Sequence, residues 1–129
     1  MKSCKLCKKK FLPDKYNKNQ QIFCNKKCKW NYYNQNWFRE YKELRKQVIK
    51  ILGNKCVACN NEDYYVLQMD HINSDRAKDK YFKQKLYIYK KTINNPIWAR
   101  KKYQVLCCNC NYLKQFHKDI FKKRYPKIK

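Results

Sequence analysis

Nine cysteines are the residues of this 129-residue chain whose spacing points most directly to chemistry. Eight of them form four close pairs, with two or three residues between the partners: Cys4/Cys7, Cys24/Cys28, Cys56/Cys59 and Cys107/Cys110. Such pairs are typical of zinc knuckles, in which four thiolates surround one tetrahedral ion. We therefore predict two structural Zn²⁺ sites, one for the first two pairs and one for the last two.

Cys108 is the cysteine that these pairs leave over. It could replace Cys107 as a ligand, but Cys107 is favoured because it alone keeps the two-residue spacing to Cys110. No apolar stretch has the character of a signal peptide or approaches the roughly 20 residues of a membrane span. We therefore expect no membrane partner and an intracellular setting, cytoplasmic or nuclear, in which thiolates bind zinc rather than form disulfides.

Asp70 and His71 are adjacent in a chain that has only nine acidic residues and two histidines. A carboxylate is a ligand for a hard divalent ion such as Mg²⁺, and a neutral imidazole can take a proton from water at physiological pH. The pair is therefore a candidate for metal-assisted hydrolysis. Taken alone it is weak evidence, and a structural histidine is the alternative interpretation.

Asn111 directly follows the last cysteine of the fourth pair and is expected in the first turn of a final helix. Its amide oxygen could complete a metal site opposite Asp70. The alternative is a helix N-cap, a role that Asn109 or Asn111 could fill. The order of features favours the metal site: knuckle, strand, Asp-His, strand, knuckle, Asn, helix.

The first half of the chain predicts a zinc finger followed by one long helix. Residues 1–29 hold two cysteine pairs and a polar loop, and the second pair opens into a helix, which is the order of a treble-clef-like finger. From Trp30 to Leu52 apolar residues recur at steps of three and four, which predicts an amphipathic helix ended by Gly53, the only glycine. We assign its aromatic stripe to the core or to docking, with nucleic-acid stacking as the alternative.

The second half predicts two strands and two helices. Residues 64–72 are rich in strand formers. Residues 78–93 have helical periodicity and precede Asn94-Asn95-Pro96, which predicts an inserted helix that stops there. A second strand over 103–106 leads into the last cysteine pair. The final helix is expected to turn three apolar residues inward: Leu113, Phe116 and Ile120.

The formal net charge is +24, from 33 Lys and Arg against 9 Asp and Glu. Two four-thiolate zinc sites would lower it by about 2 each, which leaves roughly +20. The basic residues are spread among 12 Tyr, 6 Phe and 3 Trp, so the surface should attract polyanions. Nucleic acid is the expected partner, and on charge alone a non-enzymatic, ribosomal-type protein is an equal alternative.

The segment from Cys56 to about Gln115 resembles the HNH (His-Me finger, ββα-metal) endonuclease superfamily, in its endonuclease VII-like, zinc-braced variant. Three stretches carry the resemblance: CVAC at 56–59, MDHIN at 69–73 and YQVLCCNCNYLK at 103–114. They cover just under half of the chain and are specific only when taken together.

The resemblance implies a small α+β, zinc-stabilised fold with a ββα-metal domain, preceded by the treble-clef-like finger and the linker helix. It implies a zinc finger at 1–29, a linker helix at 30–53, a nuclease domain at 54–121 and a basic tail at 122–129, which we expect to fray.

The same resemblance implies a DNA endonuclease. His71 is the expected general base, and Asp70 and Asn111 are the expected ligands of a catalytic Mg²⁺ or Mn²⁺. Arg76 and Lys114 are candidate phosphate contacts, with plain solvated charges as the alternative.

The chain departs from the family pattern at two positions. Many HNH nucleases have His where this chain has Asn111, and the family's central Asn is replaced by Lys102, so Asn94 or Asn95 is the candidate for bracing the loop. His117 lies six residues beyond Asn111, and we expect it on the surface.

Several interpretations stay open on sequence alone. A non-catalytic zinc protein that binds nucleic acid, ribosome-like or regulatory, would use Asp70, His71 and Asn111 structurally. The N-terminal finger could grip DNA or dock a protein. A homodimer through the linker helix would supply the two active sites that a double-strand cut needs. The abundance of Lys, Asn, Tyr and Ile suits an AT-rich genome, and the resemblance to small stand-alone HNH proteins favours a phage, viral or mobile-element source.

Overall fold

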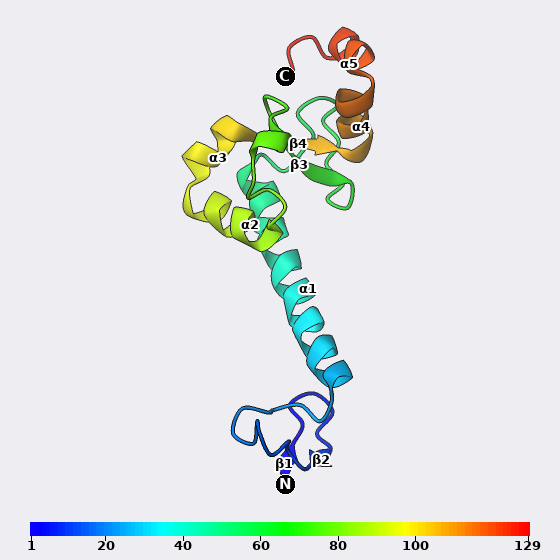
Figure 1. The fold of residues 1–129 in the computed structure, drawn as a ribbon. Coiled ribbons are helices and arrows are strands. Elements are labelled where there is room, and N and C mark those ends of the chain that lie inside the picture. Colours follow the sequence, from blue (N-terminus) through cyan, green and yellow to red (C-terminus); the bar gives the residue numbers. More distant parts are fainter. The chain divides into compact units, whose positions relative to one another are not determined.

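The computed structural model describes residues 1–129 as an α+β chain with five α-helices and two small antiparallel sheets (Figure 1). The chain divides into two compact units, 1–40 and 41–129, and the boundary falls inside helix α1 (Lys26–Ile51). None of the helices combines the length and apolar character needed to cross a membrane.

Helix α1 starts earlier than the predicted Trp30, because Asn25 caps it. The side-chain oxygen of Asn25 accepts from the N–H of Cys28 at 2.8 Å. The predicted end is confirmed: Gly53 has φ +113° and Asn54 N–H donates to the carbonyl of Ile49 at 2.9 Å. This bond and the left-handed glycine form a Schellman-type C-cap.

The first unit has two short strands, β1 (Lys2–Ser3) and β2 (Lys10–Phe11), which pair antiparallel. The first cysteine pair lies in the turn between them, and the second lies at the start of α1. Phe23 is buried, with its ring 5.2 Å from that of Tyr32. The core of this unit is therefore one aromatic cluster beside the thiols.

The aromatic stripe on α1 is core in its second part only. Val48 and Ile49 are buried, and Tyr41 and Leu44 pack against the core of the second unit. Three residues of the first unit are exposed, so the core part of the prediction does not hold for them and docking stays a prediction: Trp30, Tyr33 and Trp37. Only Cys4 and Phe23 are buried within residues 1–40, so that unit has no core large enough to cover them.

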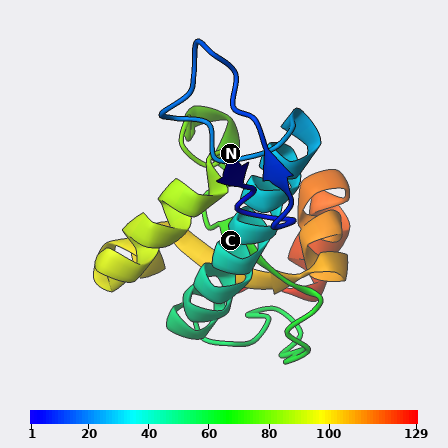
Figure 2. The same ribbon diagram turned by 90° about the horizontal axis from the view of Figure 1, so that it is seen from below.

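The second unit is built on a hairpin of β3 (Leu67–His71) and β4 (Tyr103–Cys107), in which Asp70 lies opposite Gln104 and His71 opposite Tyr103. Helix α4 (Cys108–Phe116) follows β4 without a break. The order is therefore strand, strand, helix. The view from below in Figure 2 shows the last turns of α1 between the helices before β4 and those after it.

The connection between the strands differs from the prediction. It contains a 3₁₀ turn, η1 (Arg76–Lys78), then α2 (Lys85–Asn94) and α3 (Pro96–Lys102). The predicted helix over 78–93 was wrong in its first part. The chain turns at Asp79, because the side chain of Asp79 bonds to residues outside this segment. Pro96 does end α2, but it also occupies the first turn of α3, where the missing N–H needs no partner.

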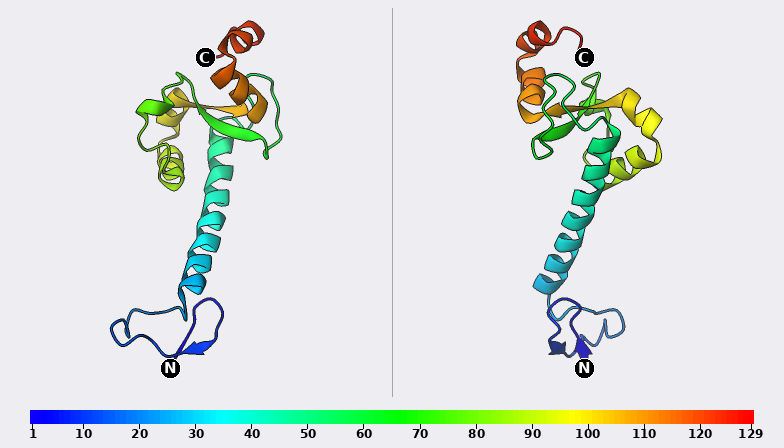
Figure 3. Two further views of the ribbon diagram at one scale, coloured as in Figure 1. Left: turned by 45° about the vertical axis from the view of Figure 1, so that its right-hand side comes forward. Right: turned by 180° about the vertical axis from the view of Figure 1, so that it is seen from behind.

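The final helix is broken at His117, whose φ of −134° is not helical, and α5 (Lys118–Arg124) begins after it. The break changes the helical phase. Phe121 is therefore buried, whereas Phe116 and Ile120, which were predicted to point inward, are exposed. The tail does not fray as expected: Tyr125 and Ile128 pack against the core, and Figure 3 shows the chain end turning back from α5.

Candidate functional site

The eight paired cysteines form two clusters, as predicted. Within each cluster the four Sγ atoms lie within 4.8 Å of one another, and all cysteines are free thiols. The separations of Cys7–Cys24 and Cys59–Cys107 are 3.6 and 3.7 Å. Zn–S bonds of about 2.3 Å in a tetrahedron give an edge of about 3.8 Å. Both clusters could therefore hold a zinc ion.

The two knuckles share one backbone conformation. The residue after each second cysteine, Lys8 or Asn60, is left-handed, with φ of 63° or 61°. Its N–H donates to the carbonyl of the first cysteine, Cys4 or Cys56, at 3.0 or 2.9 Å. This turn folds the loop around the sulfur atoms without needing a glycine.

The first cysteine of each knuckle is the one most easily ionised. Burial alone would raise the pKa of Cys4, but backbone N–H groups of Cys24, Cys7 and Leu6 lower it to about 6. The pKa of Cys56 is lowered by the same kind of bonds against burial. Burial, with the neighbouring sulfurs, instead raises the pKa of Cys24 to about 12. Four thiolates so close together need a cation to remain ionised.

Cys107, not Cys108, belongs to the second cluster. Cys108 is exposed, whereas the Sγ of Cys107 also accepts from the N–H of Cys110 and caps α4. The capping role considered for Asn109 or Asn111 is therefore filled by a cysteine. Asn111 is half-buried on the first turn, and its side chain does not cap the helix.

A cavity of about 120 Å³ lies beside this cluster in the second unit, and all five site residues outside the cysteines line it: Asp70, His71, Arg76, Asn111 and Lys114. Ser74, Phe82 and Gln115 complete much of the wall. The structure thus brings together residues that are up to 44 positions apart in sequence.

Lys114 is neither a solvated charge nor an exposed cation. It is 5 % exposed, and its ammonium donates to Oδ2 of Asp70 and to the carbonyl of His71, both at 2.6 Å. Gln104, directly opposite in the hairpin, also donates to Oδ2 of Asp70, at 2.9 Å. The bonds from Lys114 and Gln104 therefore fix the carboxylate at the end of β3.

His71 is 2 % exposed and is held by Asp79, a residue that the sequence analysis missed. Nε2 of His71 lies 3.1 Å from Oδ2 of Asp79, which also accepts from the hydroxyl of Tyr103. Burial opposes ionisation of Asp79, but its bonds from Tyr103, His71 and Lys102 hold its pKa well below the ordinary value. An ionised carboxylate only accepts, so Nε2 is the donor and the neutral ring keeps Nδ1 as acceptor.

The loop after β3 is braced by Lys102. Ile72 N–H donates to the carbonyl of Lys102 at 3.0 Å, and the ammonium of Lys102 lies 3.1 Å from Asp79. Asn95 instead donates to the carbonyl of Lys91 within its own helix turn. His117 is exposed, as predicted.

Asn111 is held by two glutamines. Its amide donates to Oε1 of Gln68 at 2.6 Å, and its Oδ1 accepts from Gln115 at 3.1 Å. Arg76 is exposed, with its guanidinium 5.3 Å from the centre of the Phe82 ring. The cavity wall therefore combines one carboxylate, one imidazole, two amides and two cations.

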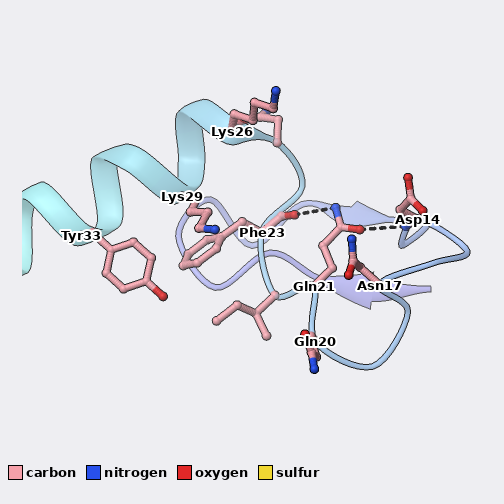
Figure 4. Close-up of a pocket in the computed structure, with 10 residues that line it drawn as sticks. Asp14, Asn17, Gln20, Gln21, Phe23, Lys26, Lys29 and Tyr33 are labelled. Carbon is pink, nitrogen blue, oxygen red and sulfur yellow. Dashed lines mark hydrogen bonds between the residues drawn. The ribbon is translucent and has the colours of Figure 1, made fainter.

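The first unit has an open cavity of its own, of about 530 Å³. Figure 4 shows Gln21 across it, accepting from the N–H of Asp14 at 2.7 Å and donating to the carbonyl of Phe23 at 3.0 Å. The rest of the lining consists of amides, two lysines, Ile22 and Tyr33, with no histidine or cysteine. It has no counterpart of the adjacent Asp70 and His71 that line the cavity of the second unit.

Comparisons with protein-family models, with curated proteins and with solved structures found no match to this chain.

Proposed function

We propose that this chain is a metal-dependent endonuclease of the HNH (His-Me finger) type that hydrolyses DNA phosphodiester bonds. The observation that carries the proposal is the shared cavity of Asp70, His71, Asn111, Lys114 and Arg76. These side chains offer oxygen ligands, a proton acceptor and cations for a phosphate. The order β3, β4, α4 around the cavity supports the same proposal.

Asp70 and Asn111 would hold the catalytic Mg²⁺ or Mn²⁺. Lys114 and Gln104 both bond to Oδ2 of Asp70, so the carboxylate would offer Oδ1, and Asn111 would offer its amide oxygen. Such a small set of protein oxygens suits Mg²⁺, which keeps several waters and takes phosphate oxygens of the substrate as further ligands. When bound, the ion would stabilise negative charge on the phosphoryl group and on the leaving oxygen.

His71 would transfer the proton. Asp79 holds Nε2, so Nδ1 is the atom that accepts a proton from the attacking water. The water oxygen bonds to phosphorus, the bond from phosphorus to the 3′ oxygen breaks, and the leaving 3′ alkoxide takes up a proton from solvent. The proton on Nδ1 is then released to solvent. The ionised Asp79 stabilises the imidazolium, because the two groups carry opposite charges in a buried site.

The test compares the two histidines of the chain. Zinc-loaded protein is incubated with supercoiled and branched DNA in Mg²⁺, in Mn²⁺ and in EDTA. We expect cleavage by the wild type and by His117→Ala, and none by His71→Ala, His71→Gln or in EDTA. Equal zinc content and circular dichroism establish that the His71 variants are folded. Cleavage that persists in folded His71 variants, or that never occurs in the wild type, would defeat the proposal.

A non-catalytic zinc protein that binds nucleic acid is the second candidate. The buried ion pair between Lys114 and Asp70 favours it, because a carboxylate that already has a cation needs no metal. In that case the wild type binds DNA but leaves it intact under every metal condition of the same experiment.

A further inference from the structure

A groove of about 330 Å³ lies in the second unit beside the catalytic cavity. The two share part of their walls: Met69, Arg76, Phe82 and Asn111 line both. A chain molecule in the groove would therefore reach the cavity directly.

The groove is lined by cations and aromatic rings and by no acidic residue. Arg45, Arg76 and Lys85 are its charged residues, and its rings include the exposed Tyr65. Arg45 donates to the carbonyls of Tyr64 and Leu67, which anchors it without neutralising its charge. This lining favours an anion with flat, apolar groups.

Two of the cations lie against one ring. The ammonium of Lys85 is 3.7 Å from the centre of the Phe82 ring, and the guanidinium of Arg76 is 5.3 Å from it. Burial, and then the charge of Arg76, lower the pKa of Lys85 to about 8. The acid that acts on Lys85 is Asp79, whose carboxylate is already bonded to His71, Tyr103 and Lys102. Lys85 is partly desolvated and Arg76 is exposed, and an anion held between these two cations would relieve their mutual repulsion.

We infer that the groove binds one unpaired nucleic-acid strand, with the phosphate next to the scissile one held by Arg76 and Lys85 and a base stacked on Tyr65. The link to cleavage rests on the proposed function, but strand binding does not. A single strand fits because a stacking ring needs an exposed base face, and a duplex offers none along its length.

The test measures binding, not cleavage. Zinc-loaded His71→Gln protein is titrated in EDTA-free buffer without Mg²⁺ into a labelled single strand and a labelled duplex, at several salt concentrations. With Lys85→Gln added, we expect the slope of log K against log salt to fall by about 0.7 for the single strand. Lys83→Gln, an exposed lysine of the same segment, should leave the slope unchanged.

Tyr65→Ala tests the stacking. It should weaken single-strand binding by about 5- to 100-fold and duplex binding much less. An unchanged slope in Lys85→Gln, or equal losses for strand and duplex in Tyr65→Ala, would overturn the inference. If strand binding depends on Lys85 but the wild type never cleaves, the groove stands and the proposed nuclease falls. If the wild type cleaves but Lys85→Gln binds the single strand normally, the proposed nuclease stands and the inference about the groove falls.

Discussion

The ammonium of Lys114 lies 2.6 Å from the Oδ2 atom of Asp70, and both side chains are buried. Lys114→Met should lower the free energy of unfolding by about 3–5 kcal/mol, because it leaves a buried carboxylate without its cation. Asp70→Asn in the same chain should restore much of the loss. Urea denaturation of the zinc-loaded proteins measures both changes, and the exposed Lys118→Met is the matched control. A loss that Asp70→Asn does not relieve contradicts an electrostatic cause.

Asp79→Asn should reduce cleavage without removing any metal ligand. The amide cannot act as the ionised acceptor of His71, so the ring loses the partner that fixes Nε2 as donor. We expect kcat to fall by about 10² to 10⁴, the range of a general-base contribution, with zinc content unchanged. Single-turnover cleavage measures it. Asp119→Asn, an exposed carboxylate on α5, should cleave normally, and an equal fall there would argue against a specific role for Asp79.

Zinc content should follow the cysteine clusters. The wild type and Cys108→Ser should each hold two ions per chain, one for each cluster. Cys4→Ser and Cys107→Ser should each lose one ion. Elemental analysis of dialysed protein measures this, and Cys107→Ser should also unfold the second unit, because its cluster joins the start of α4 to the knuckle at Cys56. Loss of zinc in Cys108→Ser would show that the wrong thiol has been assigned.

Strand binding should weaken as the pH rises from about 7 to about 9. The pKa of Lys85 is lowered to about 8, so this residue is charged at the lower pH and neutral at the higher one. Lys85→Arg should abolish the change, because a guanidinium stays ionised throughout. Fluorescence anisotropy at constant salt measures both proteins. The same pH dependence in the arginine variant would exclude Lys85 as its source.

Asn60 offers a test of the knuckle turn. Its φ of 61° is left-handed, a conformation that a β-branched residue adopts poorly. Asn60→Val should therefore destabilise the second unit by about 1–2 kcal/mol, while Asn60→Gly should leave it nearly unchanged. Chemical denaturation at saturating zinc gives the comparison, and equal stability of the two variants would contradict the geometric argument.

The parts of the fold that could be predicted are those with a local signal. The cysteine spacing predicts both clusters, and the position of Gly53 predicts the end of α1, because each depends on residues close together in the chain. The gathering of Asp70, His71 and Asn111 around one cavity was predicted from the order of motifs, which the antiparallel hairpin then brings together.

The parts that were missed depend on partners far along the chain. No local pattern tells which of many lysines is buried. Lys114 was expected to be a phosphate contact or a solvated charge, and its ion pair with Asp70, 44 residues away, was missed. Asp79 was hidden within a helical periodicity, and its carboxylate bonds to His71 and to the N–H of Tyr81 in the turns that precede α2. The single non-helical residue His117 likewise changed which apolar side chains of the last helices face inward.

The second cysteine cluster also sets when the site can form during synthesis. Asp70 and His71 emerge from the ribosome well before Cys107, Cys110 and Asn111, and the hairpin lacks its second strand until Tyr103–Cys107 has been made. A nascent chain that stops short of these residues has Asp70 and His71 but neither the complete cysteine cluster nor Asn111. The order of translation therefore delays formation of this cavity until the last fifth of the sequence has appeared.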